Sequence, residues 1–175
     1  SVTVDDNFVG EQMQLPRKDT LWVKGLNMYA HAMVIINQKG DTYLGAKEGT
    51  VSEAVAAEAG AGFGLKESQV VAVSDKGFIV TDGKANIYIN TKSDVKVGDK
   101  VTLKGLRSSY NGLPSLSDCE NIVVNGTGTV QHMTALDLST SLGNFKSTSV
   151  DYVAVKGATL VGTQIISTDG GKLVF

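Results

Sequence analysis

The sequence is poor in the residues that build disulfide scaffolds: its 175 residues contain one cysteine, Cys119, and only 2 prolines. A single cysteine excludes a disulfide within the chain, and we interpret Cys119 as a small buried or half-buried thiol. No apolar run approaches the roughly 18 residues that a membrane-spanning helix needs. We therefore expect a chain that is held together by an apolar core and has no membrane span.

Groups that carry out catalysis or bind metals are also scarce and scattered. The two histidines, His31 and His132, are not spaced with cysteines or carboxylates as metal ligands are. Neither a Gly-x-Ser-x-Gly elbow nor a phosphate loop ending in Gly-Lys-Ser/Thr occurs. The aspartates that would suggest calcium fall in separate turns, namely Asp75, Asp82, Asp94 and Asp99. The sequence predicts no enzyme, no metal and no cofactor, although a site assembled from distant loops stays open.

Neither sign of charge dominates the chain. It has 16 Lys and Arg against 18 Asp and Glu, a formal net charge of −2 and a pI of about 5.6. General nucleic-acid binders are usually basic, so this balance argues against that class. Apolar residues make up 42% and charged residues 19%, which favours a folded core over disorder.

What the sequence does contain is a dense series of strand and turn signals between residues 69 and 124. Asp82-Gly83 and Asn111-Gly112 are strong signals for tight hairpin turns. Ile87 and Ile89 share one face of the third strand, and Tyr88 lies on the other with Asn86 and Asn90, so we expect one buried and one wet face. Five strands this short predict a closed barrel, because an open sheet would leave two unpaired edges. The expected strands cover residues 69–73, 78–81, 85–90, 100–105, and the pair 113–116 and 122–124.

One short helix is expected to lead into this barrel. Thr50 and Glu53 form a capping box, and Gly60 is placed to end the helix. Residues 61–64 are interpreted as a flexible connector, and residues 134–142 as a short helix or an irregular crossing. Strands are also expected in both flanks, at residues 2–4, 20–26, 32–37, 42–44, 151–156, 164–168 and 172–175.

The central stretch resembles a known fold family. The segments that carry the resemblance are GFIVTDG at 77–83, IYI at 87–89, VGDKVTLKG at 97–105 and SYNG at 109–112. They are similar to OB-fold domains of secreted bacterial proteins, including lipoproteins of Bacteroides-type gut bacteria and domains attached to extracellular nucleases. The resemblance covers about residues 50–125. It implies an OB-like barrel in an exported protein (periplasmic, cell-surface or extracellular). The usual helix between strands three and four is reduced to Ser93-Asp94-Val95, which leaves that end of the barrel without an obvious plug.

A weak internal repeat suggests how the flanks are organised. Thr81-Asp82-Gly83 recurs as Thr168-Asp169-Gly170, and an apolar-x-apolar-Lys-Gly pattern occurs at 21–25, 101–105 and 153–157. Coincidence among strands that end at glycine is the alternative. Our interpretation is that residues 150–175 begin a second OB-like unit. Its missing strands would come from residues 1–49, from another chain by swapping, or from a part of the protein not present here, and we expect the first. The predicted divisions are 1–49, 50–126 and 127–175.

The function we predict is a non-catalytic binding or spacer module. Residues 66–107 carry eight lysines and arginines against five carboxylates, and Tyr88 and Tyr110 are placed to stack a base or a sugar. The alternatives are a single-stranded nucleic-acid-binding OB domain and a carbohydrate-binding module; another protein domain is a further candidate partner. A solvated lysine-rich face with the aromatics, Phe78 above all, in the core is the structural alternative. The candidate ligand-binding residues are Tyr88, Lys92, Lys104, Arg107, Tyr110 and Asn111.

Overall fold

The structure, a computed structural model, describes residues 12–14, 20–24, 27–28 and 46–175. It is mostly strand (49%) with 7% helix, which confirms the all-β prediction. The strands expected at 2–4, 32–37 and 42–44, together with His31, lie outside the described residues.

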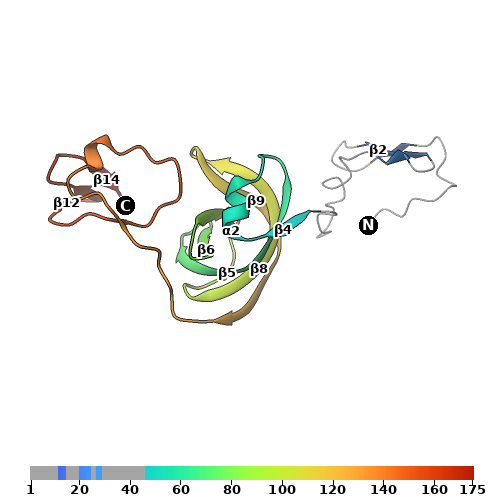
Figure 1. Cartoon of the computed structure of the whole chain (residues 1–175), viewed down its shortest axis with the longest axis horizontal. Coiled ribbons are helices and arrows are strands. Elements are labelled where there is room, and N and C mark those ends of the chain that lie inside the picture. Colours follow the sequence, from blue (N-terminus) through green and yellow to red (C-terminus); the bar gives the residue numbers. More distant parts are fainter. Residues whose placement is uncertain (1–11, 15–19, 25–26, 29–45) are drawn as a thin grey trace.

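The central element is a closed five-stranded mixed barrel, as predicted (Figure 1). Its strand order is β5-β6-β7-β9-β8, and β8 closes the barrel by pairing with β5. The β7–β9 pair is parallel and the other pairs are antiparallel. The strands are β5 (Gly62–Val73), β6 (Phe78–Thr81), β7 (Asn86–Asn90), β8 (Asp99–Tyr110) and β9 (Leu113–Thr127).

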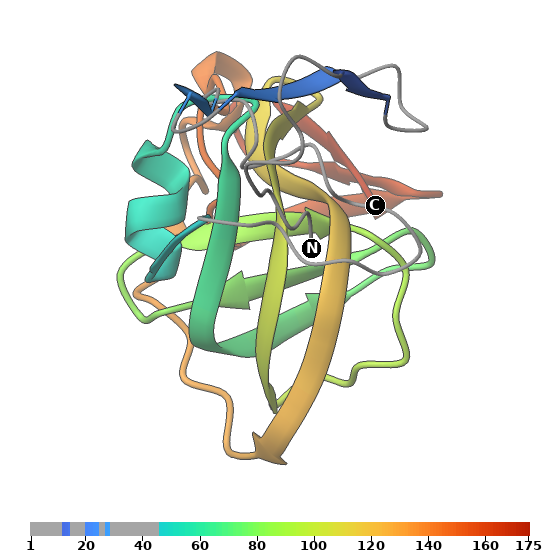
Figure 2. The same cartoon turned by 90° about the vertical axis from the view of Figure 1, so that its right-hand side faces the viewer.

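The last two barrel strands are longer than the sequence predicted. β9 is one strand where two were expected, and β8, expected to end at residue 105, continues to Tyr110, directly before the Asn111-Gly112 turn. Register shifts interrupt the β8–β9 ladder at three places, and such bulges let a long pair bend. Figure 2 shows both strands curving along the barrel wall.

The barrel interior is filled by the apolar positions that alternate along its strands. Ile87 and Ile89 are fully buried, and Phe78 is 1% exposed, as predicted. One expectation was wrong: Asn86, assigned to the wet face, is buried, because the chain at Val150 crosses over it and accepts a hydrogen bond from its Nδ2 (3.0 Å). The core consists of Val51, Ala54, Phe63, Leu65, Val70, Phe78, Val80, Ile87, Ile89, Val95, Val101, Leu103 and Leu116.

The predicted helix forms but is shorter than expected. Helix α2 (Val51–Ala56) begins at the predicted capping box, in which the Thr50 side chain accepts from the Glu53 amide. It ends at Ala57, whose backbone is extended, and not at Gly60. Its buried residues, Val51 and Ala54, belong to the barrel core, so α2 plugs the barrel from the segment that precedes the first strand.

Two further predictions concern the connections around the barrel, and the first of them was wrong. Residues 61–64 are no connector, because β5 already begins at Gly62 and pairs there with β8. No helix forms between β7 and β8, as predicted, and Val95 from that loop packs into the core with 6% exposure.

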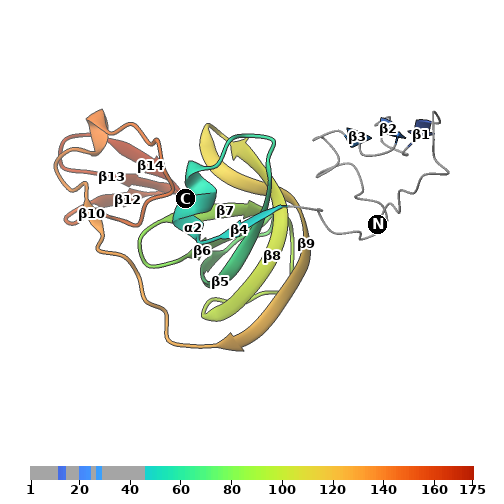
Figure 3. The ribbon, with the colours of Figure 1, turned by 45° about the vertical axis from the view of Figure 1, so that its right-hand side comes forward.

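The flanks form further small sheets. The first 49 residues contribute β1 (Gln12–Gln14), β2 (Thr20–Lys24) and β3 (Asn27–Met28), which pair with each other, and β4 (Lys47–Gly49), which pairs in parallel with β5. Figure 3 shows the C-terminal sheets beside the barrel. The predicted pairing of 1–49 with 150–175 involves residues outside the described ranges and stays a prediction. The C-terminal elements are β10 (Leu136–Asp137), the 3-10 helix η2 (Leu142–Asn144), β11 (Val153–Ala154), β12 (Thr159–Val161), β13 (Gln164–Ile166) and β14 (Lys172–Val174).

Candidate ligand-binding surface

Two of the predicted site residues, Tyr88 and Tyr110, lie against each other on the outside of the barrel. Their ring centroids are 4.9 Å apart, and the rings are tilted by 40°. Tyr88 lies between the buried Ile87 and Ile89, so alternation along β7 turns it outward. Both tyrosines are half-buried. They form one aromatic surface, made by β7 and β8, which flank β9 on its two sides.

A serine that the sequence analysis did not single out lies on the same face of the sheet, buried beneath this surface. Ser115 of β9 is the direct cross-strand partner of Tyr88 and of Ser108, and Tyr110 is two residues further along β8. Ser115 is fully buried, and its Oγ has no hydrogen-bond partner among the described residues. A buried hydroxyl without a partner costs free energy. The one local sign was the placement of this small polar residue between apolar ones in a predicted strand.

The turn between β5 and β6 closes onto the tyrosine surface at Gly77. A Cβ at this position would lie 2.1 Å from the Ile89 carbonyl oxygen and 2.8 Å from the Tyr88 hydroxyl. Only glycine permits this approach. Asn111, another predicted site residue, is exposed at the neighbouring β8–β9 turn with a φ of 50°. The face of β7 thus carries Tyr88, the β8–β9 turn places Tyr110 and Asn111 beside it, and the β5–β6 turn borders this surface at Gly77.

The predicted lysines lie in two different places. Lys92 is exposed in the loop that follows β7. Lys104 lies on the β5–β8 side of the barrel, where its Nζ is 4.0 Å from a Glu48 carboxylate oxygen. A second pocket, of about 450 Å³, lies on that side and is lined by Lys104 and Glu48 among others. Lys104 therefore belongs to a different part of the surface from the tyrosines.

Arg107, predicted to lie beside Tyr110 as a ligand contact, has its guanidinium committed to the backbone of the helix. Its Nε donates to the Ala54 carbonyl (2.9 Å) and its Nη2 to the Val55 carbonyl (3.0 Å). Nη1 donates to the carbonyl of Ser108. Burial lowers the pKa of the Arg107 guanidinium. The structure assigns Arg107 a structural role at the end of α2, and its contact with a ligand stays a prediction.

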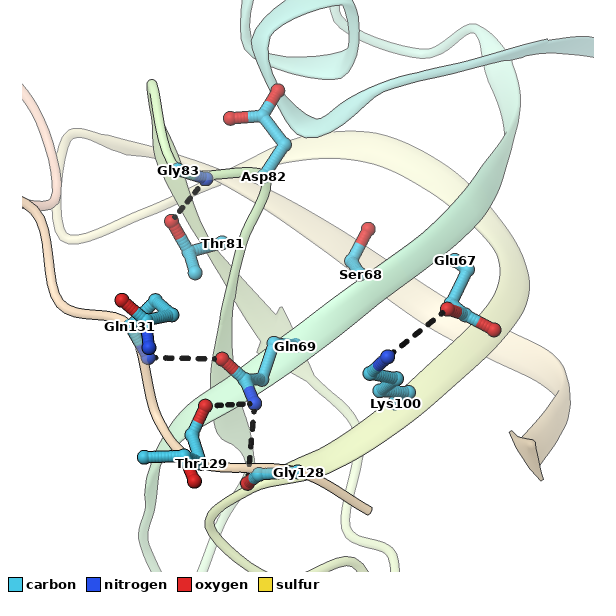
Figure 4. Close-up of a pocket in the computed structure, with 10 residues that line it drawn as sticks. All are labelled: Glu67, Ser68, Gln69, Thr81, Asp82, Gly83, Lys100, Gly128, Thr129 and Gln131. Atoms are coloured by element: carbon cyan, nitrogen blue, oxygen red, sulfur yellow. Dashed lines mark hydrogen bonds and ion pairs between the residues drawn. The ribbon is translucent and has the colours of Figure 1, made fainter. Parts of the chain in front are cut away.

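A further pocket, of about 520 Å³, lies on the other side of β5 (Figure 4). Gln69 holds the chain that leaves β9 against this side: its Nε2 donates to the Thr129 carbonyl (3.0 Å), and its Oε1 accepts from the Gln131 amide (3.1 Å). The Lys100 Nζ and a Glu67 carboxylate oxygen are 3.9 Å apart across the pocket. Its polar groups therefore bind one another, and the pocket offers no convergent unpaired charge.

Asp82, which also lines this pocket, is occupied by backbone donors. Burial works against its ionisation, but hydrogen bonds from the Ser52 amide and hydroxyl and from the amides of Ala85 and Lys84 outweigh burial. Together they lower the pKa of Asp82 to about 2. Its carboxylate joins the start of α2 to the β6–β7 turn and is committed to holding the fold.

The other reactive side chains, Cys119 and His132, also pack against neighbouring residues. Cys119 is half-buried against the core, as predicted, and burial raises the pKa of its thiol to about 12. His132 is exposed and stacks on Tyr152, with ring centroids 4.4 Å apart. Within the described ranges, no group of three or more His, Cys, Asp and Glu side chains is placed to hold a metal ion. No helix in the part of the chain that the structure describes is long and apolar enough to cross a membrane.

The chain matches no protein-family model, no curated protein and no solved structure.

Proposed function

We propose that this chain is a non-catalytic binding module whose ligand lies over the Tyr88–Tyr110 pair. The observation that carries the proposal is the meeting of these two rings, 4.9 Å apart, on the outer face of a closed five-stranded barrel. The described strands follow the order 1-2-3-5-4, counted from β5, and close on the first. In barrels of the OB class, the face of strands 2 and 3 and the 1–2 and 4–5 loops bind oligonucleotides and oligosaccharides. Tyr88, Gly77 and Asn111 lie in those places.

The chemistry of this surface suits a ligand with a flat face and hydroxyl or amide groups. Tyrosine rings stack on the faces of bases and sugars, and their hydroxyls offer hydrogen bonds at the rim. The unpartnered Ser115 hydroxyl lies between the two tyrosine-bearing strands, but it is fully buried, so a ligand over the rings does not reach it directly. These features support a binding role whose affinity comes from stacking.

The charges favour a neutral ligand, such as a glycan, over a nucleic acid. Several lysines of the described surface are within 4.0 Å of carboxylates, among them Lys100 beside Glu67 and Lys104 beside Glu48. Glu67 is already counted in the local excess of cations in residues 66–107, and Glu48, which lies outside that range, reduces this excess further. A chain with a net charge of −2 has little general attraction for phosphates. Single-stranded nucleic acid is the second candidate, because OB-class barrels use the same aromatic face for it.

The test is a titration of the protein with fluorescently labelled oligosaccharides and with labelled single-stranded DNA and RNA, at low and moderate salt. We expect oligosaccharide binding that changes little with salt, whereas nucleic-acid binding would weaken steeply, since phosphate contacts release counterions. Tyr88→Ala and Tyr110→Ala should each weaken binding by about 10- to 100-fold, because one stacked ring contributes roughly 1–3 kcal/mol.

Val97→Ala is the control, because Val97 is exposed in the loop before β8, at the opposite end of that strand from Tyr110. It should bind like the unmodified protein. If neither class of probe binds at low salt, or if both tyrosine variants bind as well as the control, the proposed surface is wrong and a spacer role is favoured. The exported location implied by the OB resemblance is a separate proposal, which cell fractionation would test.

A further inference from the structure

The C-terminal segment repeats, element by element, the order of the segment that starts the barrel. β4 pairs in parallel with β5 and is followed by α2; β10 pairs in parallel with β11 and is followed by η2. The second half of β5 then pairs with β6, and β6 with β7, all antiparallel. β12 pairs with β13, and β13 with β14, in the same way. β11 and β12 thus correspond to the two halves of β5, separated at Gly157, which has a φ of 65°.

The two hairpin turns share their hydrogen-bond chemistry as well. Thr81 Oγ1 donates to the carbonyl of Ala85 (2.9 Å), and Ser167 Oγ donates to the carbonyl of Gly171 (3.2 Å), four residues on in both cases. Thr81 comes one residue before its turn aspartate and Ser167 two residues before its own, so the second turn is one residue longer. Both hydroxyl residues are buried, with exposures of 4% and 5%. The glycine after each turn aspartate has a similar positive φ, 84° at Gly83 and 81° at Gly170.

The turn aspartates also make the same long-range contact. Asp82 Oδ2 accepts from the amide of Ser52 in α2 (2.8 Å), and Asp169 Oδ2 accepts from the amide of Gly143 in η2 (3.0 Å). Each carboxylate therefore ties the hairpin to the short helix that precedes its sheet. Shared strand order, turn chemistry and helix contact are three independent points of agreement. We infer that residues 136–175 are the first three strands of a second barrel of the same design.

The second unit differs from the first in what covers it. In the barrel, β8 pairs with the edge of β5, and β9 pairs with the edge of β7. Among the described residues, β12 and β14 are the edges of a three-stranded sheet. Leu160, Ile165 and Leu173 are direct cross-strand partners and so form an apolar row on one face. Leu160 is 67% and Leu173 37% exposed, whereas Val80 and Ile87 of the closed barrel are fully buried.

The repeat identifies the kind of partner that this sheet fits. The open edges and apolar row take an antiparallel β-hairpin equivalent to β8–β9, which pairs one strand with β12 and the other with β14. Such a hairpin presents alternating apolar side chains inward, as Val101, Leu103 and Leu116 do in the barrel. Backbone pairing at exposed edges supplies affinity, and the apolar row supplies the shared core. The β12–β14 sheet is thus a docking surface for a polypeptide hairpin, distinct from the tyrosine surface.

The experiment extends the full 175-residue chain after Phe175 by a second copy of residues 91–127, which contains the β7–β8 loop and the β8–β9 hairpin. A matched control extension carries serine at the copied positions of Val101, Leu103 and Leu116. Amide hydrogen exchange, followed by NMR, is read at residues 159–161 and 172–174. Exchange at Val80 and Ile87 reports whether the first barrel stays folded in every variant.

We expect exchange at the two edge strands to slow by at least about tenfold with the extension and to stay unchanged with the control. Equal exchange in both would overturn the proposal. So would slow exchange already present in the unextended monomer, which would mean that the chain closes this sheet itself, as the predicted pairing with 1–49 requires. Protection that rises with protein concentration would assign the surface to a second copy instead of a hairpin of this type.

Discussion

Replacing Arg107 tests whether a side chain inside the barrel wall holds the helix that plugs it. Helix α2 has only six residues, far too few to be stable by itself, so its position depends on tertiary contacts. Arg107 donates to the carbonyls of Ala54 and Val55 at the C-terminal end of the short helix, where Ala54 also accepts from the Ala57 amide. A hydrogen bond to a charged group contributes about 1.5–3 kcal/mol, and part of this is lost to solvent at a half-buried site. We expect Arg107→Ala to lower the free energy of unfolding by roughly 2–3 kcal/mol.

Urea unfolding, followed by circular dichroism, measures this loss, and hydrogen exchange at Ala54 and Gly60 locates it. Arg107→Lys should recover less than half of the stability, because an ammonium cannot reach both carbonyls in the geometry of a guanidinium. Lys92→Ala, which removes an exposed cation from a loop, is the matched control and should change stability by less than about 0.5 kcal/mol. If Arg107→Ala is as stable as the Lys92 variant, the guanidinium does not hold α2.

Three further predictions concern single side chains of the barrel. Asp82→Asn should lower the free energy of unfolding by about 1–2 kcal/mol at pH 7. Because the folded pKa of Asp82 is depressed to about 2, this difference between variant and unmodified protein should fade as the pH drops from about 4 to 2. Urea titrations at several pH values measure it, and a constant difference would contradict the assigned hydrogen bonds. Cys119, whose pKa is raised to about 12, should react with a thiol reagent at pH 8 far more slowly in the folded protein than in urea, and equal rates would show an open thiol. Gly77→Ala should cost about 2–4 kcal/mol in thermal unfolding, because its Cβ would overlap the Ile89 carbonyl, whereas Gly126→Ala, with open space around the added Cβ, should be nearly neutral; similar losses would refute the close approach.

The parts of the fold that local sequence specifies were predicted well. The start of α2 follows from a capping box in which Thr50 and Glu53 satisfy each other's backbone partners, and no distant residue is needed. The bounds of β6 were predicted residue for residue, because Asp82-Gly83 and the turn before Phe78 delimit a short apolar run. The inward alternation of Ile87 and Ile89 likewise predicted the buried face of β7.

The errors come from contacts between residues far apart in the chain. The end of α2 was misplaced because its last carbonyls are taken by Arg107, more than 50 residues away. Residues 61–64 looked flexible because of their glycines, yet Gly64 is a strand residue whose missing side chain lets Glu48 pack against it: a Cβ there would be 3.0 Å from the Glu48 Cγ. The aromatic pair was anticipated as separate residues, but its meeting over Ser115 depends on β7 and β9 pairing in parallel. Local propensity carries no information about that pairing.

The recurrence of Thr-Asp-Gly shows what such a local signal does specify. At Asp82 and at Asp169 it produces a tight turn, a glycine with positive φ and a carboxylate that accepts a hydrogen bond from a backbone amide of the preceding helix. The burial of the adjoining strands differs nevertheless, since Ile87 of β7 is fully buried and Leu173 of β14 is 37% exposed. The motif therefore fixes the hairpin and its attachment to the helix, whereas burial of the apolar face requires the long strands that close the barrel. A thermodynamic test of the second unit therefore has to add a closing hairpin. A mutation in the turn would measure only the stability of the turn.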